Sequence, residues 1–194
     1  MPADSPSPDR ARLWPPVLGR ALAALAFGAV TVFWGQPTTT GAAWVLAGYL
    51  WLMLAAQTWL LRSERPAPRR SSALTALIPY VLAALAGVAV VAVPSVGVIG
   101  GGGAVALILM GASDLARALL ARRGPASGVT PLGRDLPITG IVGLGAGILL
   151  PFFSGLGPHA LLGVAGGGAI ITGVLLAIAA LSLRHDSTGA ARVA

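Results

Sequence analysis

Six stretches of the sequence are apolar over a length that would cross a lipid bilayer, and this feature constrains the chain more than any other. A transmembrane helix needs about 20 predominantly apolar residues. The stretches that meet or approach this length are 17–34, 41–61, 74–93, 96–120, 136–153 and 160–183. The sequence therefore predicts an all-α, polytopic membrane protein with six transmembrane helices.

The scarcity of charge supports a membrane protein and excludes two soluble classes. Of 194 residues, 56% are hydrophobic and only 10% are charged, whereas soluble domains carry about 25% charged residues. So few charges could not cover the surface of a soluble enzyme or nucleic-acid-binding protein, despite a formal net charge of +7. We expect the lipid bilayer as partner and no nucleic acid. A second copy of the chain or another membrane protein remains an open alternative.

The basic residues are distributed asymmetrically between the connections. All 13 are arginines, and they lie in or beside the two termini and the connections 62–73 and 121–135. The other connections, 35–40, 94–95 and 154–159, are short and uncharged. The spans therefore form three helical hairpins. By the positive-inside rule both termini lie in the cytoplasm, and the protein is a multi-pass protein of the cell membrane, with a composition typical of a GC-rich bacterial genome.

These boundaries divide the chain into three parts. We expect residues 1–16, which are rich in Pro and Ser, to form a disordered cytoplasmic tail. The membrane domain covers 17–184, and 185–194 form a second cytoplasmic tail. Within the membrane domain the hairpins are 17–62, 74–123 and 134–184.

The hairpins are expected to be repeats of one another. Pro37, Pro94 and Pro151 are each 57 residues from the next, and each closes the first helix of its hairpin. Proline cannot donate a backbone hydrogen bond, so it suits the point where a helix leaves the hydrocarbon. In the third hairpin Gly173 follows its proline by 22 residues, whereas Gly111 follows Pro94 by 17. The third outer connection is therefore expected to be longer by five residues.

Each hairpin follows the same order of features, from an arginine near its start through glycine and aliphatic residues to a proline turn, a second aliphatic helix and a basic exit. The residues that carry the pattern are Leu18, Gly19, Arg20, Gly28, Pro37 and Arg62; Gly87, Pro94, Gly111 and Arg122; and Arg134, Gly145, Pro151, Gly173 and Arg184. With this pattern the chain resembles the HdeD-type bacterial inner-membrane proteins, described as acid-resistance membrane proteins. The resemblance implies six spans in three two-helix repeats, no established catalytic site and an association with stress or acid resistance.

Glycines at small-xxx-small spacing are the strongest local signal inside the spans. The pairs are Gly97 with Gly101, Gly143 with Gly147, and Gly163 with Gly167. Small residues let helix backbones approach closely in lipid, so we expect these pairs to be packing surfaces. The alternative is a flexible or broken helix that lines a substrate cavity.

Few polar side chains fall inside the spans. Asp114 and Arg117 are three residues apart on one predicted helix, so we expect them to pair with each other. Gln57 occupies the position that matches Asp114 in the first repeat. Arg20, about one turn inside the first span, is expected to extend toward the headgroups. Asp114, Arg117 and Gln57 are the candidate polar intramembrane site.

Catalytic templates and metal sites are not expected. The chain has no cysteine and only two histidines, which are too few for a usual metal site. His159 falls in an outer connection, far from Asp114, so no Ser-His-Asp set is expected. We therefore predict no catalytic residues, no metal and no cofactor, and a non-enzymatic, stress-associated membrane protein. The alternative is a small multi-pass transporter or channel with its polar site around Asp114, Arg117 and Gln57.

Overall fold

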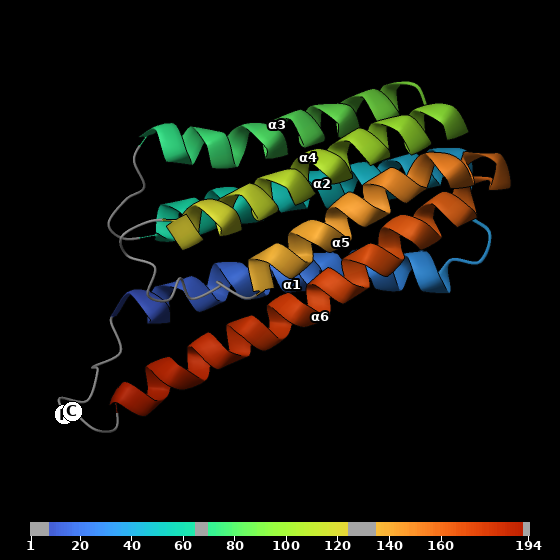
Figure 1. Ribbon diagram of the computed structural model, residues 1–194. Helices are drawn as coiled ribbons and strands as arrows, with labels where there is room; N and C mark the ends of the chain where they lie inside the picture. Colours follow the sequence, from blue (N-terminus) through green and yellow to red (C-terminus); the bar gives the residue numbers. More distant parts are fainter. Residues whose placement is uncertain (1–7, 65–69, 124–134, 192–194) are drawn as a thin grey trace.

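Every regular element in the described residues of the computed structural model, 8–64, 70–123 and 135–191, is helical (Figure 1). The elements are α1 (Pro8–Phe33), α2 (Thr39–Ser63), α3 (Arg70–Ala92), α4 (Val96–Arg123), α5 (Asp135–Leu149), the 3-10 helix η1 (Leu150–Leu156) and α6 (Pro158–Ala191). Six helical segments, the fifth formed by α5 with η1, are long and apolar enough to cross a membrane. The all-α fold with six such helices is confirmed, while the threefold hairpin repeat stays a prediction.

The six helices close into a ring. Each helix packs against the next one along the chain, and α6 returns to pack against α1. Inside the ring the backbones of α2, α4 and α6 approach one another, whereas the backbones of α1, α3 and α5 do not approach each other among the described residues. The two most extensive interfaces join α1 to α6 and α4 to α5. The two largest interfaces therefore join different expected hairpins and do not lie within one.

The buried residues of each helix form a stripe at helical spacing. On α2 this stripe contains Leu46, Leu50, Met53, Gln57 and Leu60, which recur every three or four residues on one side of the helix. The outer surfaces carry large apolar side chains on every α-helix. An apolar surface of this extent would promote association of a protein in water, but lipid chains cover it in a bilayer.

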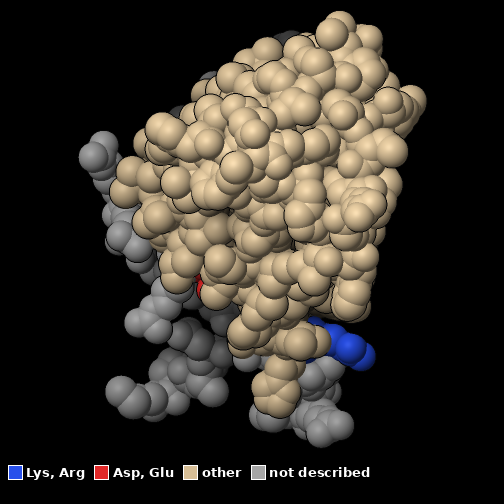
Figure 2. Space-filling view, turned by 90° about the vertical axis from the view of Figure 1, so that its right-hand side faces the viewer, with Lys and Arg blue, Asp and Glu red and all other residues tan. Residues whose placement is uncertain are grey.

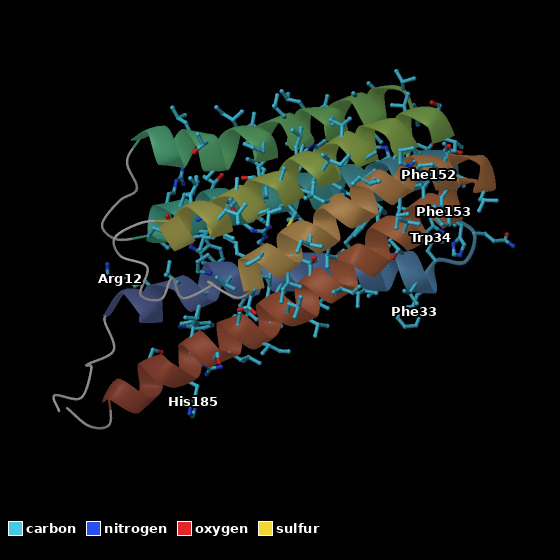
Figure 3. All side chains as sticks on the ribbon, in the orientation of Figure 1. Arg12, Phe33, Trp34, Phe152, Phe153 and His185 are labelled. Carbon is cyan, nitrogen blue, oxygen red and sulfur yellow. The ribbon has the colours of Figure 1, made fainter. Side chains whose placement is uncertain are left out.

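The two ends of the bundle differ in character. Figure 2 looks toward the end that carries the connections α1–α2, α3–α4 and α5–α6, and basic side chains appear only at its lower edge. In Figure 3 the aromatic residues Phe33, Trp34, Phe152 and Phe153 lie at this end, opposite Arg12 and His185. The described part of the chain thus has an aromatic end and an arginine-bearing end.

The structure corrects the expected N-terminal tail. Residues 8–16, expected to be disordered, form the first turns of α1, while 1–7 lie outside the described residues. Leu13 and Val17 are buried there in a cluster with Leu176 and Leu183 of α6. This apolar contact compensates for Pro15 and Pro16, which interrupt the backbone hydrogen bonds of the helix. The basic connections 65–69 and 124–134 also lie outside the described residues.

The three repeat prolines lie in three different backbone settings. Pro37 lies in the irregular connection between α1 and α2, and Pro94 in the tight turn between α3 and α4. Pro151 is near the start of η1, which lengthens the third connection. Gly157 then turns the chain into α6 with a φ of 90°, a conformation that glycine adopts without steric cost.

Candidate functional site

A buried ion pair between Arg20 of α1 and Asp114 of α4 lies at the centre of the polar residues in the bundle. Two guanidinium nitrogens of Arg20 donate to the two carboxylate oxygens of Asp114. The side chains are only 7% and 3% exposed, so little water reaches either charge. Charge-assisted, bidentate pairs of this kind are the strongest hydrogen-bonded contacts between side chains.

Two neutral side chains complete the cluster. The Tyr80 hydroxyl of α3 accepts a hydrogen bond from Arg20 and donates one of 2.8 Å to Asp114. Gln57 of α2 accepts a hydrogen bond of 3.4 Å from Arg20 through its Oε1 atom. Arg20 also lies 5.3 Å from the centre of the Tyr80 ring, within range of a cation–π contact. We call Arg20, Gln57, Tyr80 and Asp114 the polar cluster; it joins four helices.

Each member of the polar cluster occupies a buried stripe that is mostly apolar. On α4, Asp114 follows Leu107 and Met110 at spacings of seven and four residues. On α1, Arg20 is followed by Ala24, which is fully buried and takes little space beside the long arginine side chain. The helical repeat therefore directs the four polar side chains toward one another.

The polar cluster lies inside the apolar length of the helices and closer to the arginine-bearing end. Arg20 is eight residues from the start of its membrane-length segment at Arg12, or about 12 Å along the helix. Asp114 is seven residues from the end of its segment at Ala121, or about 10 Å. Since the hydrocarbon core of a bilayer is about 30 Å thick, these charges are roughly one third of the way across.

Two expectations about the charged residues are wrong. Asp114 pairs with Arg20, whereas Arg117 donates a hydrogen bond of 2.7 Å to Glu64 at the end of α2. Although Asp114 and Arg117 lie on the same face of α4, they do not pair, because the guanidinium of Arg20 approaches Asp114 from a neighbouring helix. Because Arg20 is bonded to Asp114 inside the bundle, its side chain does not extend to the headgroups. Of the three candidate site residues, the structure brings Asp114 and Gln57 together through Arg20 and places Arg117 in a separate pair.

Three buried side-chain nitrogens have no hydrogen-bond partner in the described part of the chain. They are Nε of Arg20, Nε2 of Gln57 and Nη1 of Arg117. All three are N–H donors on α1, α2 and α4. Buried polar groups in proteins are nearly always hydrogen-bonded to the protein or to an ordered water molecule, so this region has hydrogen-bonding capacity for an acceptor.

The candidate packing glycines divide into two groups. Gly143 and Gly147 of α5 lie against α4, where a β-carbon on Gly147 would be 2.7 Å from Ile108. At Gly97, Gly101, Gly163 and Gly167 a β-carbon would meet no atom within 4 Å. These four glycines therefore form no close helix contacts within the chain, contrary to expectation.

The glycines that do allow close approach lie in two interfaces. Between α4 and α5, a β-carbon on Gly111 would come within 2.6 Å of the backbone nitrogen of Leu144. Between α1 and α6, close contacts occur at Gly28, Gly166 and Gly173. Gly166 precedes the expected Gly167 by one residue, and one residue turns a helix by about 100°, which is enough to move a side chain from the interface to the outside.

Three members of these polar contacts were not predicted from the sequence. Tyr80 was not among the candidate residues, Arg20 was expected to extend toward the headgroups, and Glu64 was assigned no partner. A detectable signal for the first two was their place in an apolar stripe with the period of a helix. Within the described residues no three His, Cys, Asp or Glu side chains come together as a metal site would require.

Comparisons with known proteins found no match to any family model, curated protein or solved structure. What is established is therefore the class that the fold defines, a bundle of six helices long and apolar enough to span a membrane. The resemblance to the HdeD family stays a prediction from the sequence pattern.

Proposed function

We propose that the chain is a non-enzymatic, multi-pass protein of the cell membrane, of the HdeD type, that contributes to resistance to acid or a related stress. The hairpin pattern of the sequence supports the family. The observation that supports a response to acid is the buried Asp114 carboxylate, which holds α1 through Arg20 and α3 through Tyr80.

A proton on Asp114 would change the forces between these helices. The charged and titratable groups around Asp114 are Arg20 of α1, Tyr80 of α3, Tyr49 of α2 and, one turn along α4, Arg117. Protonation removes the negative charge that compensates Arg20 and leaves a buried, unpaired guanidinium. Because an unpaired charge is costly in low dielectric, acid on the side that reaches Asp114 would shift the packing of α1 against α4.

The test is acid survival of cells that depend on this protein. We expect Asp114→Asn, which imitates the protonated carboxyl, to reduce survival at low pH while the variant reaches the membrane at parental levels. Arg62→Gln removes an exposed charge at the same end of the bundle and serves as the control with normal survival. Full survival with Asp114→Asn would refute a role for this carboxylate in acid resistance.

A small transporter or channel is the second candidate function. The observation that favours it is the set of buried donors without acceptors, which includes atoms of both Gln57 and Arg117. Liposomes that contain the purified protein are expected under this function to conduct protons or small organic acids faster than empty liposomes. Equal fluxes in the two preparations would eliminate transport of these solutes.

We also propose that both termini are cytoplasmic, on the basis of the arginine distribution. Reporter fusions at Ser127 and at the C-terminus should then report the cytoplasm, whereas fusions at Thr39 and Gly157 should report the opposite side. A cytoplasmic signal at Thr39 would contradict the six-span topology.

A further inference from the structure

The polar cluster separates two parts of the bundle that differ in what they bury. Between the cluster and the aromatic end (Figure 3), an apolar core joins all six helices. Asp114 is 18 residues from the start of its membrane-length segment at Val96, or about 27 Å along the helix. The large side chains of this core are at most 5% exposed and include Leu46, Leu50, Ile99, Leu107, Leu150 and Leu161. A proton from the aromatic end would have to cross this core to reach Asp114.

The buried hydroxyl groups of this part do not form a path for a proton. They belong to Thr31, Tyr49 and Thr172. Thr31 donates to the carbonyl of Gly28 on its own helix. Among the described residues no hydrogen bond joins the three hydroxyls to one another. Because a charge without a partner is strongly disfavoured in apolar surroundings, this part of the bundle is a barrier to protons.

On the arginine-bearing side, polar side chains lead from Asp114 to the surface. Arg117 lies three residues beyond Asp114, or about 4.5 Å along α4, and donates a hydrogen bond of 2.7 Å to Glu64. Their side chains are 22% and 27% exposed, so water reaches both. Nη1 of Arg117 has no partner among the described residues, and buried donors of this kind are usually bonded to an ordered water molecule. Water therefore comes within about one turn of Asp114.

The rest of the arginine-bearing part is apolar. Leu13 and Val17 of α1 are buried together with Leu60 of α2 and with Leu176 and Leu183 of α6. This cluster closes the corner between α1, α2 and α6. The polar approach to Asp114 is thus confined to the corner between α2 and α4 that contains Arg117 and Glu64.

The charged groups around Asp114 leave water as the source of its proton. These groups are Arg20 of α1, Tyr49 of α2, Tyr80 of α3 and Arg117 of α4 itself. α5 and α6 have ionisable residues only near their ends. Arginine keeps its proton in proteins, so neither guanidinium can supply one to the carboxylate.

We propose that Asp114 exchanges its proton with the arginine-bearing end of the bundle only, through the corner between Arg117 and Glu64. This inference rests on the acid response proposed above, which requires that Asp114 is protonated. A proton from water on that side forms an O–H bond on Asp114, and no other covalent bond is made or broken. With the arginine-bearing end in the cytoplasm, the protein responds to acid in the cytoplasm and not to the pH outside the cell.

The experiment follows the infrared carbonyl stretch of the protonated Asp114 carboxyl in sealed liposomes that contain the full-length protein. One preparation has the C-terminus outward and the other has it inward, as established by protease access to a C-terminal tag. Lowering the external pH should produce the signal at once when the C-terminus is outward. When it is inward, the signal should appear only after an ionophore carries protons into the liposomes.

Three variants assign the signal and the route. Asp114→Asn lacks this carboxyl and supplies the blank for all other carboxyl groups. The double variant Glu64→Leu, Arg117→Leu makes the corner apolar and should slow proton uptake at least about tenfold, with the same final amplitude. Arg62→Gln removes an exposed charge at the same end and should take up protons as fast as the parent.

The possible failures are distinguishable. An immediate signal with the C-terminus inward would overturn the inference and leave the proposed acid response in place. Absence of the Asp114 signal at every pH, even with ionophore, would overturn both. An unchanged rate in the double variant would place the proton entry elsewhere. Should Asp114→Asn fail to fold, Asp114→Glu identifies the signal instead, because a changed carboxyl side chain shifts its frequency.

Discussion

The polar cluster and the glycine interface between α4 and α5 hold the same bundle together by different means. Asp114 and Gly111 lie one turn apart on α4, but Asp114 binds Arg20 of α1 whereas Gly111 approaches the backbone of α5. In lipid the hydrophobic effect does not drive helices together, so association depends on close packing and on polar contacts. The cluster specifies which side chains meet, and the glycines set how closely backbones approach.

The largest effect is expected where one charge of the polar cluster loses its partner. Arg20→Met should lower the free energy of unfolding in detergent by about 3–5 kcal/mol, because the Asp114 carboxylate is left buried and uncompensated. The double variant Arg20→Met, Asp114→Asn should recover much of this loss, since a neutral amide is less costly to bury than a lone charge. Equilibrium unfolding of the parent, both single variants and the double variant gives the coupling energy.

A second cycle serves as the control for this pairing. Asp114→Asn combined with Arg117→Gln should give nearly additive losses, because Arg117 is bonded to Glu64. If Asp114 coupled more strongly to Arg117 than to Arg20, the distinction between the polar cluster and the peripheral ion pair would be lost.

A smaller effect is expected from a single methyl group at the glycine interface. Gly111→Ala should destabilise the protein by about 1–3 kcal/mol, a typical cost of overpacking, because the β-carbon would lie 2.6 Å from the backbone of Leu144 and a backbone cannot rotate away. Gly101→Ala on the same helix meets open space and should be neutral or slightly stabilising. Thermal unfolding in detergent compares the two variants, and equal stabilities would show that α4 and α5 separate without cost.

The contrast between the two regions also explains what the sequence could predict. The six apolar helices were predictable because the length and composition of each stretch depend on neighbouring residues only. The identity of Asp114 as a buried polar residue was also accessible. Its partner was not, because Arg20 is 94 residues away along the chain and the choice between it and Arg117 depends on how α1 rotates against α4.

The glycines show the same limit at finer scale. Small-xxx-small spacing occurs at Gly143 and Gly147, which face α4, and also at Gly163 and Gly167, which face no other helix. Spacing defines a face of one helix, but only the neighbouring helix determines whether that face is covered. Gly166 and Gly167 are neighbours in the sequence and point in directions about 100° apart on the helix. Gly166 therefore lies against Thr31 of α1, whereas Gly167 faces no other helix.

The smallest effect is expected at the peripheral ion pair between Arg117 and Glu64. Their side chains are 22% and 27% exposed, so water partly solvates both charges and replaces much of the attraction when the pair is broken. Glu64→Gln should therefore cost less than about 1 kcal/mol, and the cost should fall further in high salt because exposed charges are screened. Arg62→Gln, which removes an exposed charge nearby, is the matched control, and unfolding at low and high salt is the measurement.

A loss of stability as large as that of Arg20→Met, unaffected by salt, would mean that Arg117 lies in the same low-dielectric environment as Arg20. The polar cluster would then extend to the end of α2.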